Sequence, residues 1–300
     1  MRSRAHANGI IAILLIVLIV ALVWNWPSSR KNIVSARSAL YALARERGRA
    51  DYAESIAAWH EQASEHFVIR YQSSDADIAG AVLAAAEEHQ AEVARDIGYA
   101  PQVKTLIALY PTRESLRDSF GWPANQNAVG VYWAGAIRLL SPHAWVMSDD
   151  PDEIARVFRA SGPVVHEYTH LVLDYRTGGN YTRWFTEGLA QWEEQRITGY
   201  VWDEPDGDLA DYSPDQLYTL RDLGGSFDSL DNQALAYRES LSFVTYLASA
   251  DGGAKLKAVI ARLAEHYPLD LALADVYRLS VDRLEQDWLA WVQANPRPWK

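Results

Sequence analysis

Residues 166–170 read His-Glu-Tyr-Thr-His, and seventeen residues after the second histidine Glu187 lies in the stretch Trp-Phe-Thr-Glu-Gly-Leu-Ala. On a helix, His166 and His170 share one face because they are four residues apart. Two imidazoles at that spacing can bind one zinc ion, and Glu167 can then reach a water on the metal. Glu187, from a second helix, would be the third ligand. The fourth position then stays open for water, as in catalytic zinc sites.

The segments around this motif predict two helices joined by a turn. Apolar residues flank the motif on both sides, namely Val164, Val165, Leu171 and Val172. Such residues bury the sides of a helix that lies inside a domain. Gly178-Gly179-Asn180 ends this helix, and a second helix that carries Glu187 begins near Thr182. In the alternative interpretation the two histidines are simply hydrogen-bonded core or surface residues, and the presence of Glu187 weakens it.

The two motifs together, His-Glu-x-x-His and then Trp-x-x-Glu-Gly-x-Ala, resemble the gluzincin metallopeptidases. They are similar to the peptidase MA-like family and to the catalytic domain of aminopeptidase-N-like and thermolysin-like zinc peptidases. A third segment, Tyr-Arg-Glu-Ser-Leu-Ser-Phe-Val-Thr-Tyr-Leu from Tyr237 onward, is similar to the family's Tyr-x-x-Gly/Ser…Val-x-x-Leu helix. The resemblance covers about residues 64–295, and outside these motifs it rests on the order of the elements.

The resemblance implies a role for each of these side chains. One Zn²⁺ per chain would be bound by the two histidines and Glu187, and Glu167 would be the general base. Tyr237 would donate a hydrogen bond to the oxyanion that forms when water attacks the carbonyl. Arg238 is a competing candidate for this last role. Tyr237 would in that case be a core tyrosine with a satisfied hydroxyl.

Two departures from these families bear on the activity. Aminopeptidase-N-like enzymes carry Gly-Ala-Met-Glu-Asn on a strand, and its glutamate holds the free amino group of the substrate. Residues 135–139 here read Gly-Ala-Ile-Arg-Leu without an acid, which favours an endopeptidase. Thermolysin-like enzymes carry a carboxylate four residues after the glutamate ligand, where this chain has Gln191, and a neutral amide would orient a zinc histidine less strongly. The strand at 135–140 is expected to offer its edge to an extended substrate.

The composition limits the partners and the metal ligands. The chain has 300 residues, 49% of them hydrophobic, which is enough for a sizeable core. It has no cysteine, so a metal must be bound through His, Asp or Glu. The formal net charge of −11 argues against nucleic acid as a partner, because an acidic surface repels phosphates. The expected partner is a peptide or protein substrate.

The N-terminus carries a continuously apolar run at 10–24, which with its neighbours is long enough to cross a bilayer. No small-x-small cleavage signature follows this run, so residues 1–27 are predicted to be an uncleaved transmembrane signal anchor. The chain would then be a single-pass protein of the cell membrane. Basic residues before the run favour an extracytoplasmic catalytic domain, although those just after it argue the reverse. Residues 28–63 are predicted to be a helical stalk or a helix packed on the domain.

The remaining chain predicts an α+β domain at 64–295. Strands are expected at 66–71, 103–110, 128–133 and 136–140, the last two as a pair. They form a small mixed sheet, which with its helices and the metal helix makes up an α/β part at 64–180. A helical part at 181–295 follows. Its helices are expected at about 232–249, 254–265, 269–278 and 281–294, after one that begins at Ser213-Pro214 and ends at Gly224-Gly225. With the resemblance, this order predicts a thermolysin-like fold.

Three hypotheses describe the function. The first is a membrane-anchored zinc metallopeptidase that hydrolyses peptide bonds. The second is a catalytically inactive peptidase-like module that binds peptides or partner proteins, and the missing acid at 135–139 and the neutral Gln191 motivate it. In the third, the zinc ion only stabilises the fold, and the open coordination position argues against this hypothesis. His143 and His266 can also bind metals, but no spacing links them to the motif, so they are taken as structural.

Overall fold

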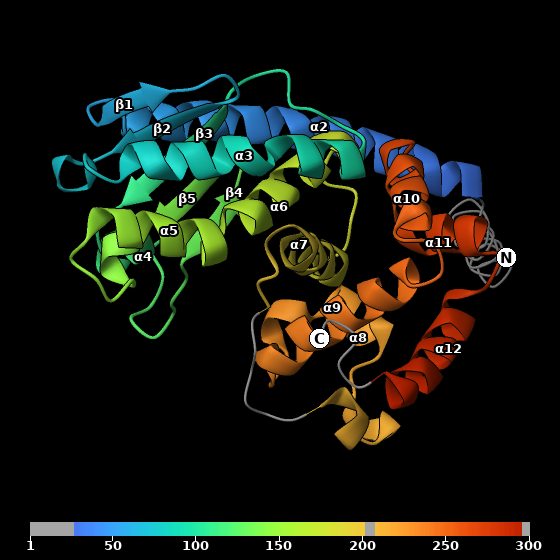
Figure 1. Ribbon diagram of the computed structural model, residues 1–300. Helices are drawn as coiled ribbons and strands as arrows, with labels where there is room; N and C mark the ends of the chain where they lie inside the picture. The colour runs from blue at the N-terminus through green and yellow to red at the C-terminus, as the bar shows by residue number, and fades with distance from the viewer. Residues whose placement is uncertain (1–26, 202–207, 296–300) are drawn as a thin grey trace, which may run out of the picture.

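The computed structural model describes residues 27–201 and 208–295, and within these residues the fold is α+β (Figure 1). This part of the chain contains eleven α-helices and one mixed sheet of five strands. The strands are β1 (His60–Ala63), β2 (Phe67–Tyr71), β3 (Thr105–Tyr110), β4 (Gly130–Trp133) and β5 (Ala136–Leu140). The helices are α2 (Pro27–Ser55), α3 (Ala79–Ile97), α4 (Arg113–Asp118), α5 (Pro151–Ser161), α6 (Val164–Thr177), α7 (Arg183–Thr198), α8 (Leu220–Gly225), α9 (Gln233–Ala248), α10 (Ala254–Ala264), α11 (Leu269–Tyr277) and α12 (Val281–Ala294).

The sheet has the strand order β1-β2-β3-β5-β4. Its inner strands β2, β3 and β5 run parallel, and β1 and β4 pair antiparallel at the two edges. The central strand β3 is the apolar run Thr-Leu-Ile-Ala-Leu-Tyr, and all of its residues are buried, as in a parallel strand covered on both faces. The strands predicted at 66–71, 103–110, 128–133 and 136–140 are confirmed, with small shifts at their ends.

Helices cover both faces of this sheet. Successive side chains of β3 point to opposite faces. Ile107 and Leu109 join the main core, to which α3 and α6 contribute. Ala108 and Tyr110 form a second, smaller cluster with residues that include Leu116 of α4. The main core continues from the sheet into the helical part, so one hydrophobic interior supports both parts.

The helix α7 lies at the centre of the fold, between α6 and α9 (Figure 1). Gly188 permits its close approach to α9, because a Cβ at this position would lie 2.2 Å from the carbonyl oxygen of Ser240. Phe243 of α9 packs edge to face on Trp184 of α7 and on Trp288 of α12, with ring centroids 5.3 and 5.5 Å apart. Glu187, next to Gly188, is therefore fixed between two helices.

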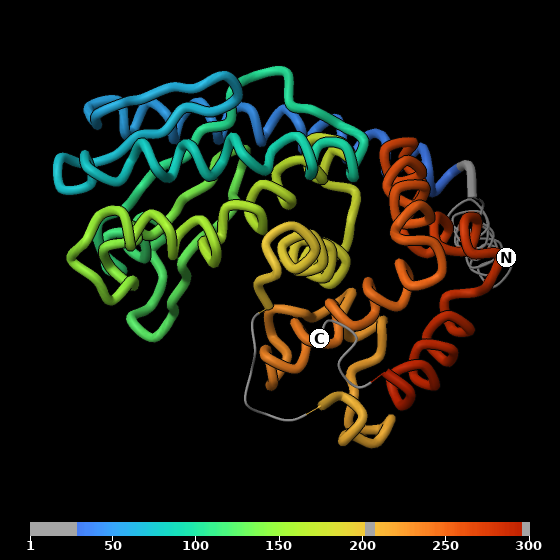
Figure 2. The backbone as a smooth tube through the Cα atoms, in the orientation of Figure 1, coloured from blue at the N-terminus to red at the C-terminus, as the bar shows by residue number. Residues whose placement is uncertain are grey.

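The helix α2 packs on the rest of the fold, and it does not project as a stalk. Its side chains Val34 and Ser38 are buried, and near its start Arg30 donates two 2.9 Å hydrogen bonds to Asp270 of α11. Figure 2 shows it passing along the sheet and on to the C-terminal helices. The prediction of helix up to residue 63 is wrong at its end, because His60–Ala63 form β1 and satisfy their backbone groups on the edge of β2. A domain boundary at residue 63 stays a prediction.

Two further predictions about helices need correction. The segment from Ser213-Pro214 forms only a short 3₁₀ turn, and α8 begins after Thr219, whose hydroxyl accepts a hydrogen bond from the Asp222 N–H. The helix α5 was missed, although Asp150-Pro151 is a capping residue followed by a first-turn proline. In the described residues no helix is both long and apolar enough for a membrane span. The apolar run at 10–24 lies outside these residues.

Candidate metal centre

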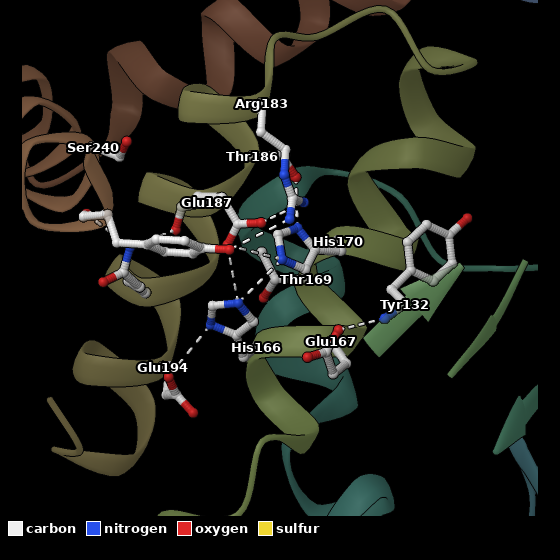
Figure 3. A network of polar contacts seen from close by, with 12 residues as sticks. Tyr132, His166, Glu167, Thr169, His170, Arg183, Thr186, Glu187, Glu194 and Ser240 are labelled. Carbon is white, nitrogen blue, oxygen red and sulfur yellow. Dashed lines mark hydrogen bonds and ion pairs between the residues drawn. The ribbon is translucent and has the colours of Figure 1, made fainter. Parts of the chain in front are cut away.

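Three side chains from α6 and α7 point toward one another (Figure 3). The Nε2 atoms of His166 and His170 lie 3.1 Å apart. The Oε2 atom of Glu187 lies 3.4 Å from the first and 3.5 Å from the second. These residues form a group that could hold a metal ion, as the sequence predicts. The histidines come from the α/β part and the glutamate from the helical part.

The spacing of these three atoms fits zinc. Ligand atoms about 2.0–2.1 Å from a tetrahedral zinc ion lie about 3.3 Å from one another. The three separations, 3.1, 3.4 and 3.5 Å, all fall close to this value. Burial alone would raise the pKa of Glu187, but His170 and Arg183 outweigh it and hold that pKa well below its usual range. The carboxylate therefore stays ionised, as a metal ligand must.

The outer nitrogen of each imidazole has its own partner. The Nδ1 atom of His170 lies 2.6 Å from the Thr186 hydroxyl. The Nδ1 atom of His166 lies 3.5 Å from Oε2 of Glu194. These contacts leave both Nε2 atoms directed at the centre of the group, which is the arrangement that orients metal-binding histidines.

The carboxylate beside His166 comes from an unexpected position. The side chain of Gln191 is engaged elsewhere, because its Nε2 donates to the carbonyl oxygens of Glu187 and Tyr237, at 3.2 and 3.1 Å. Glu194, seven residues after Glu187, lies beside His166 instead and can orient it. The weaker orientation expected from a neutral residue 191 stays a prediction. Glu187 and Glu194 lie on one side of α7 because seven residues make about two helical turns. This spacing is the feature of the sequence from which Glu194 could have been predicted.

Glu167 lies beside the three donors, buried against β4. Its Oε2 accepts a 2.6 Å hydrogen bond from the backbone N–H of Tyr132. Gly130 leaves room for it, because a Cβ there would lie 2.9 Å from Cγ and Oε1 of Glu167. Burial raises the pKa of Glu167, and the nearby imidazoles only partly oppose this shift. A carboxylate with a raised pKa is a stronger base, as proton transfer near neutral pH requires.

A family model of the Peptidase MA superfamily matches residues 85–294. The chain belongs to the Peptidase MA superfamily. The match covers more than half of the chain and includes α6, α7 and α9, so it confirms the resemblance to MA-type gluzincins found in the sequence. Membership of the superfamily gives the chain a peptidase-like domain, which implies a peptide or protein substrate. No curated protein matches the sequence.

Two further polar side chains of this superfamily member, those of Arg183 and Tyr237, lie close to Glu187. The Nη1 atom of Arg183 lies 2.5 Å from Oε1 of Glu187, and its Nη2 donates to the Tyr237 hydroxyl at 3.4 Å. One oxygen of Glu187 thus faces the histidines and the other faces the guanidinium. Burial raises the pKa of Tyr237, so the hydroxyl stays protonated and able to donate. Arg183 is not among the residues predicted from the sequence, although it lies one helical turn before Glu187.

The strand beside the site is β4, and this corrects the expectation for 135–140. The strand β5 pairs with β3 on one side and with β4 on the other, so it has no free edge. In the described residues β4 is the edge strand on this side. Arg138 of β5 is buried, donates to the Ser119 carbonyl oxygen and stacks on the rings of Tyr52 and Phe120. Its guanidinium therefore lies against the second hydrophobic cluster.

Proposed function

We propose that this protein is a membrane-anchored, zinc-dependent metallopeptidase that hydrolyses internal peptide bonds. The proposal rests on one observation above all. His166 Nε2, His170 Nε2 and Glu187 Oε2 converge within 3.1 to 3.5 Å, beside the buried carboxylate of Glu167. The first three would bind one Zn²⁺ per chain, and Glu167 and Tyr237 would act on the substrate.

Zinc, when bound by these three side chains, would supply Lewis acidity that activates water and polarises the scissile carbonyl. Glu167 would accept the proton of the attacking water and then pass it to the leaving amine. Its raised pKa matches both steps, since the carboxylate must first take up a proton and then release it. The hydroxyl of Tyr237 would donate to the developing oxyanion, and loss of one such donor typically lowers kcat about 10²- to 10³-fold.

Endopeptidase action is the more consistent specificity. Arg138, which the sequence motif aligns with the acid of aminopeptidase-N-like enzymes, lies on the inner strand β5, and the strand beside Glu167, β4, reads Gly-Val-Tyr-Trp without an acid that could hold a free amino group. In the described residues β4 is an edge strand beside Glu167, and the outward backbone groups that Glu167 does not occupy can pair with an extended peptide. A peptide held in this way needs no free terminus.

A Glu167→Gln variant tests the proposed mechanism. The amide can no longer accept a proton from water, whereas the three donors keep their places. Zinc content is expected to equal that of the wild type, and hydrolysis of a labelled protein such as casein is expected to stop. Turnover at the wild-type rate in the zinc-loaded variant would rule out Glu167 as the base.

Membrane attachment and orientation form a separate part of the proposal. The apolar run at 10–24 supports a single-pass anchor, with the catalytic domain on the extracytoplasmic side. Protease added to intact spheroplasts should digest the domain. A catalytic domain that is fully protected from the protease in intact spheroplasts and digested after lysis would contradict the proposed orientation.

A peptidase-like module that only binds peptides is the second candidate. The missing acid at residue 138 and the unpaired edge of β4 favour it. The module would bind peptides equally well with and without a chelator, and it would not hydrolyse them. Gln191 gives this candidate little support, because the carboxylate of Glu194 lies 3.5 Å from Nδ1 of His166.

A further inference from the structure

Asp174 is a fully buried carboxylate on α6, one turn after His170. Its Oδ2 accepts a 2.6 Å hydrogen bond from the Tyr132 hydroxyl, and its Oδ1 accepts a 2.9 Å hydrogen bond from the Tyr181 hydroxyl. Burial, reinforced by the charge of Asp174, raises the pKa of both tyrosines well above the usual value. Both phenols therefore remain donors, and the proposed catalytic steps leave the carboxylate unused.

Arg45 of α2 is the counter-ion of Asp174. Its Nη1 lies 3.2 Å from Oδ2 and donates at the same distance to the backbone carbonyl oxygen of Asp174. Its guanidinium stacks on the ring of Tyr175, 3.6 Å from the centroid. The Arg45 side chain is only 7% exposed and that of Asp174 is 0% exposed. Removal of either partner would leave an unpaired charge in the interior.

Tyr132 connects this charge pair to Glu167. Its side chain reaches Asp174, while its backbone N–H donates to Oε2 of Glu167 at 2.6 Å. In Figure 3 the N–H side of Tyr132 faces Glu167 and the ring points away from it. The edge strand β4 is thus attached to α6 at two points, seven residues or about two turns apart along the helix.

We propose that Asp174 is a positioning residue for Glu167, with Arg45 as its counter-ion and Tyr132 as the link. The inference rests on the proposed function. In the described residues the strand β4 is paired with another strand on one side only, so its contacts with α6 hold the other side, and the hydroxyl of Tyr132 ties the strand to Asp174. The N–H that orients Glu167 keeps its place only while this contact holds. A misplacement of about 1 Å in a catalytic group can cost about 10²-fold in rate.

Tyr132→Phe and Tyr181→Phe are a matched pair of variants for this proposal. Each removes one buried hydroxyl from the same carboxylate, but only residue 132 carries the N–H that binds Glu167. In the zinc-loaded full chain, with labelled casein as substrate, Tyr132→Phe is expected to lower kcat about 10- to 100-fold with little change in KM. Tyr181→Phe should lower the melting temperature similarly and leave kcat unchanged. Equal losses of kcat in the two variants would overturn the proposal.

Asp174→Asn tests the carboxylate itself. It should bind zinc as the wild type does and lose kcat as Tyr132→Phe does. The double variant with Tyr132→Phe should be no slower than the slower single variant, because both changes break one chain of contacts. Additive losses of kcat would instead point to two independent effects and contradict a shared path to Glu167.

Hydrogen exchange gives a second reading that does not depend on turnover. The amide of residue 132 is expected to exchange at least about tenfold faster in Tyr132→Phe than in the wild type, and to be unchanged in Tyr181→Phe. If the zinc-loaded wild type hydrolyses no protein substrate, the proposed function fails, and the exchange result alone decides whether the contact between Tyr132 and Asp174 holds the N–H of Tyr132 on Glu167. Unchanged protection of this amide in Tyr132→Phe would overturn the positioning role in either case.

Discussion

The glycine that follows the candidate ligand Glu187 sets how closely α7 and α9 approach. A Cβ added at Gly188 would lie 2.2 Å from the carbonyl oxygen of Ser240 and 2.7 Å from Cγ2 of Val244. Ordinary van der Waals contacts begin at 3.4 Å, so Gly188→Ala requires the two helices to separate by about 1.2 Å here. The obstacle is a backbone carbonyl inside a helix, which cannot rotate away as a side chain can.

The expected cost of Gly188→Ala follows from this geometry. Overpacking a core typically costs about 1–3 kcal/mol, and a rigid backbone obstacle places this site at or above the upper end. The better helix propensity of alanine returns about 1 kcal/mol. We therefore expect a net loss of about 2 kcal/mol in the free energy of unfolding. For a domain of this size that loss lowers the melting temperature by roughly 4–8 °C.

Thermal unfolding followed by circular dichroism measures this effect, with Gly225→Ala as the control. A Cβ at Gly225 would meet no atom within 4 Å, so that variant should be as stable as the wild type or slightly more stable. Because Glu187 moves with α7, Gly188→Ala should also bind zinc more weakly. A melting temperature equal to that of the wild type would refute the argument that α7 and α9 need a glycine at this contact.

Three other substitutions are expected to change zinc affinity, the free energy of unfolding and the pH dependence of stability, respectively. Glu194→Gln should weaken zinc binding about 10- to 100-fold in a chelator competition, and unchanged affinity would exclude an orienting role for this carboxylate on His166. Arg45→Met should lower the free energy of unfolding by about 3–5 kcal/mol in urea, because the buried Asp174 loses its counter-ion, and a loss below about 1 kcal/mol would contradict the buried pair. Burial raises the pKa of Glu239 from 4.5 to about 8, so the folded state holds this proton more tightly than the unfolded chain does. The contribution of Glu239 to the free energy of unfolding is therefore fully present below pH 4.5 and is lost as the pH rises through about 8. In urea titrations at several pH values, Glu239→Gln should remove this part of the pH dependence of stability.

Local patterns in the sequence predict which side chains meet at the candidate metal centre, because its geometry is local. The spacing of His166 and His170 within one helix sets their shared face, and the turn at 178–180 is short enough to bring Glu187 back against them. The strand pair at 128–140 is likewise set by its alternation and its turn. These features need no knowledge of distant segments.

Contacts between distant segments could not be predicted in the same way. The position of β5 between β3 and β4 depends on strand order, and this removed the expected free edge at 135–140. Arg45 and Asp174 are 129 residues apart, and nothing in either segment alone indicates that they meet. The same holds for the packing of α2, whose composition fits both a stalk and a docked helix. Gln191 alone does not determine how His166 is oriented, because the carboxylate of Glu194, one turn later, can serve instead.

The zinc content of the purified full chain, measured beside a Glu187→Ala variant, tests whether His166, His170 and Glu187 bind a metal ion. We expect about one zinc per chain in the wild type and much weaker binding in the variant, because one of three ligands is lost. Binding should precede any search for substrates, since an unknown substrate would make a negative activity screen uninterpretable. A wild-type chain that is fully folded and takes up no zinc would contradict the account and favour the peptide-binding module.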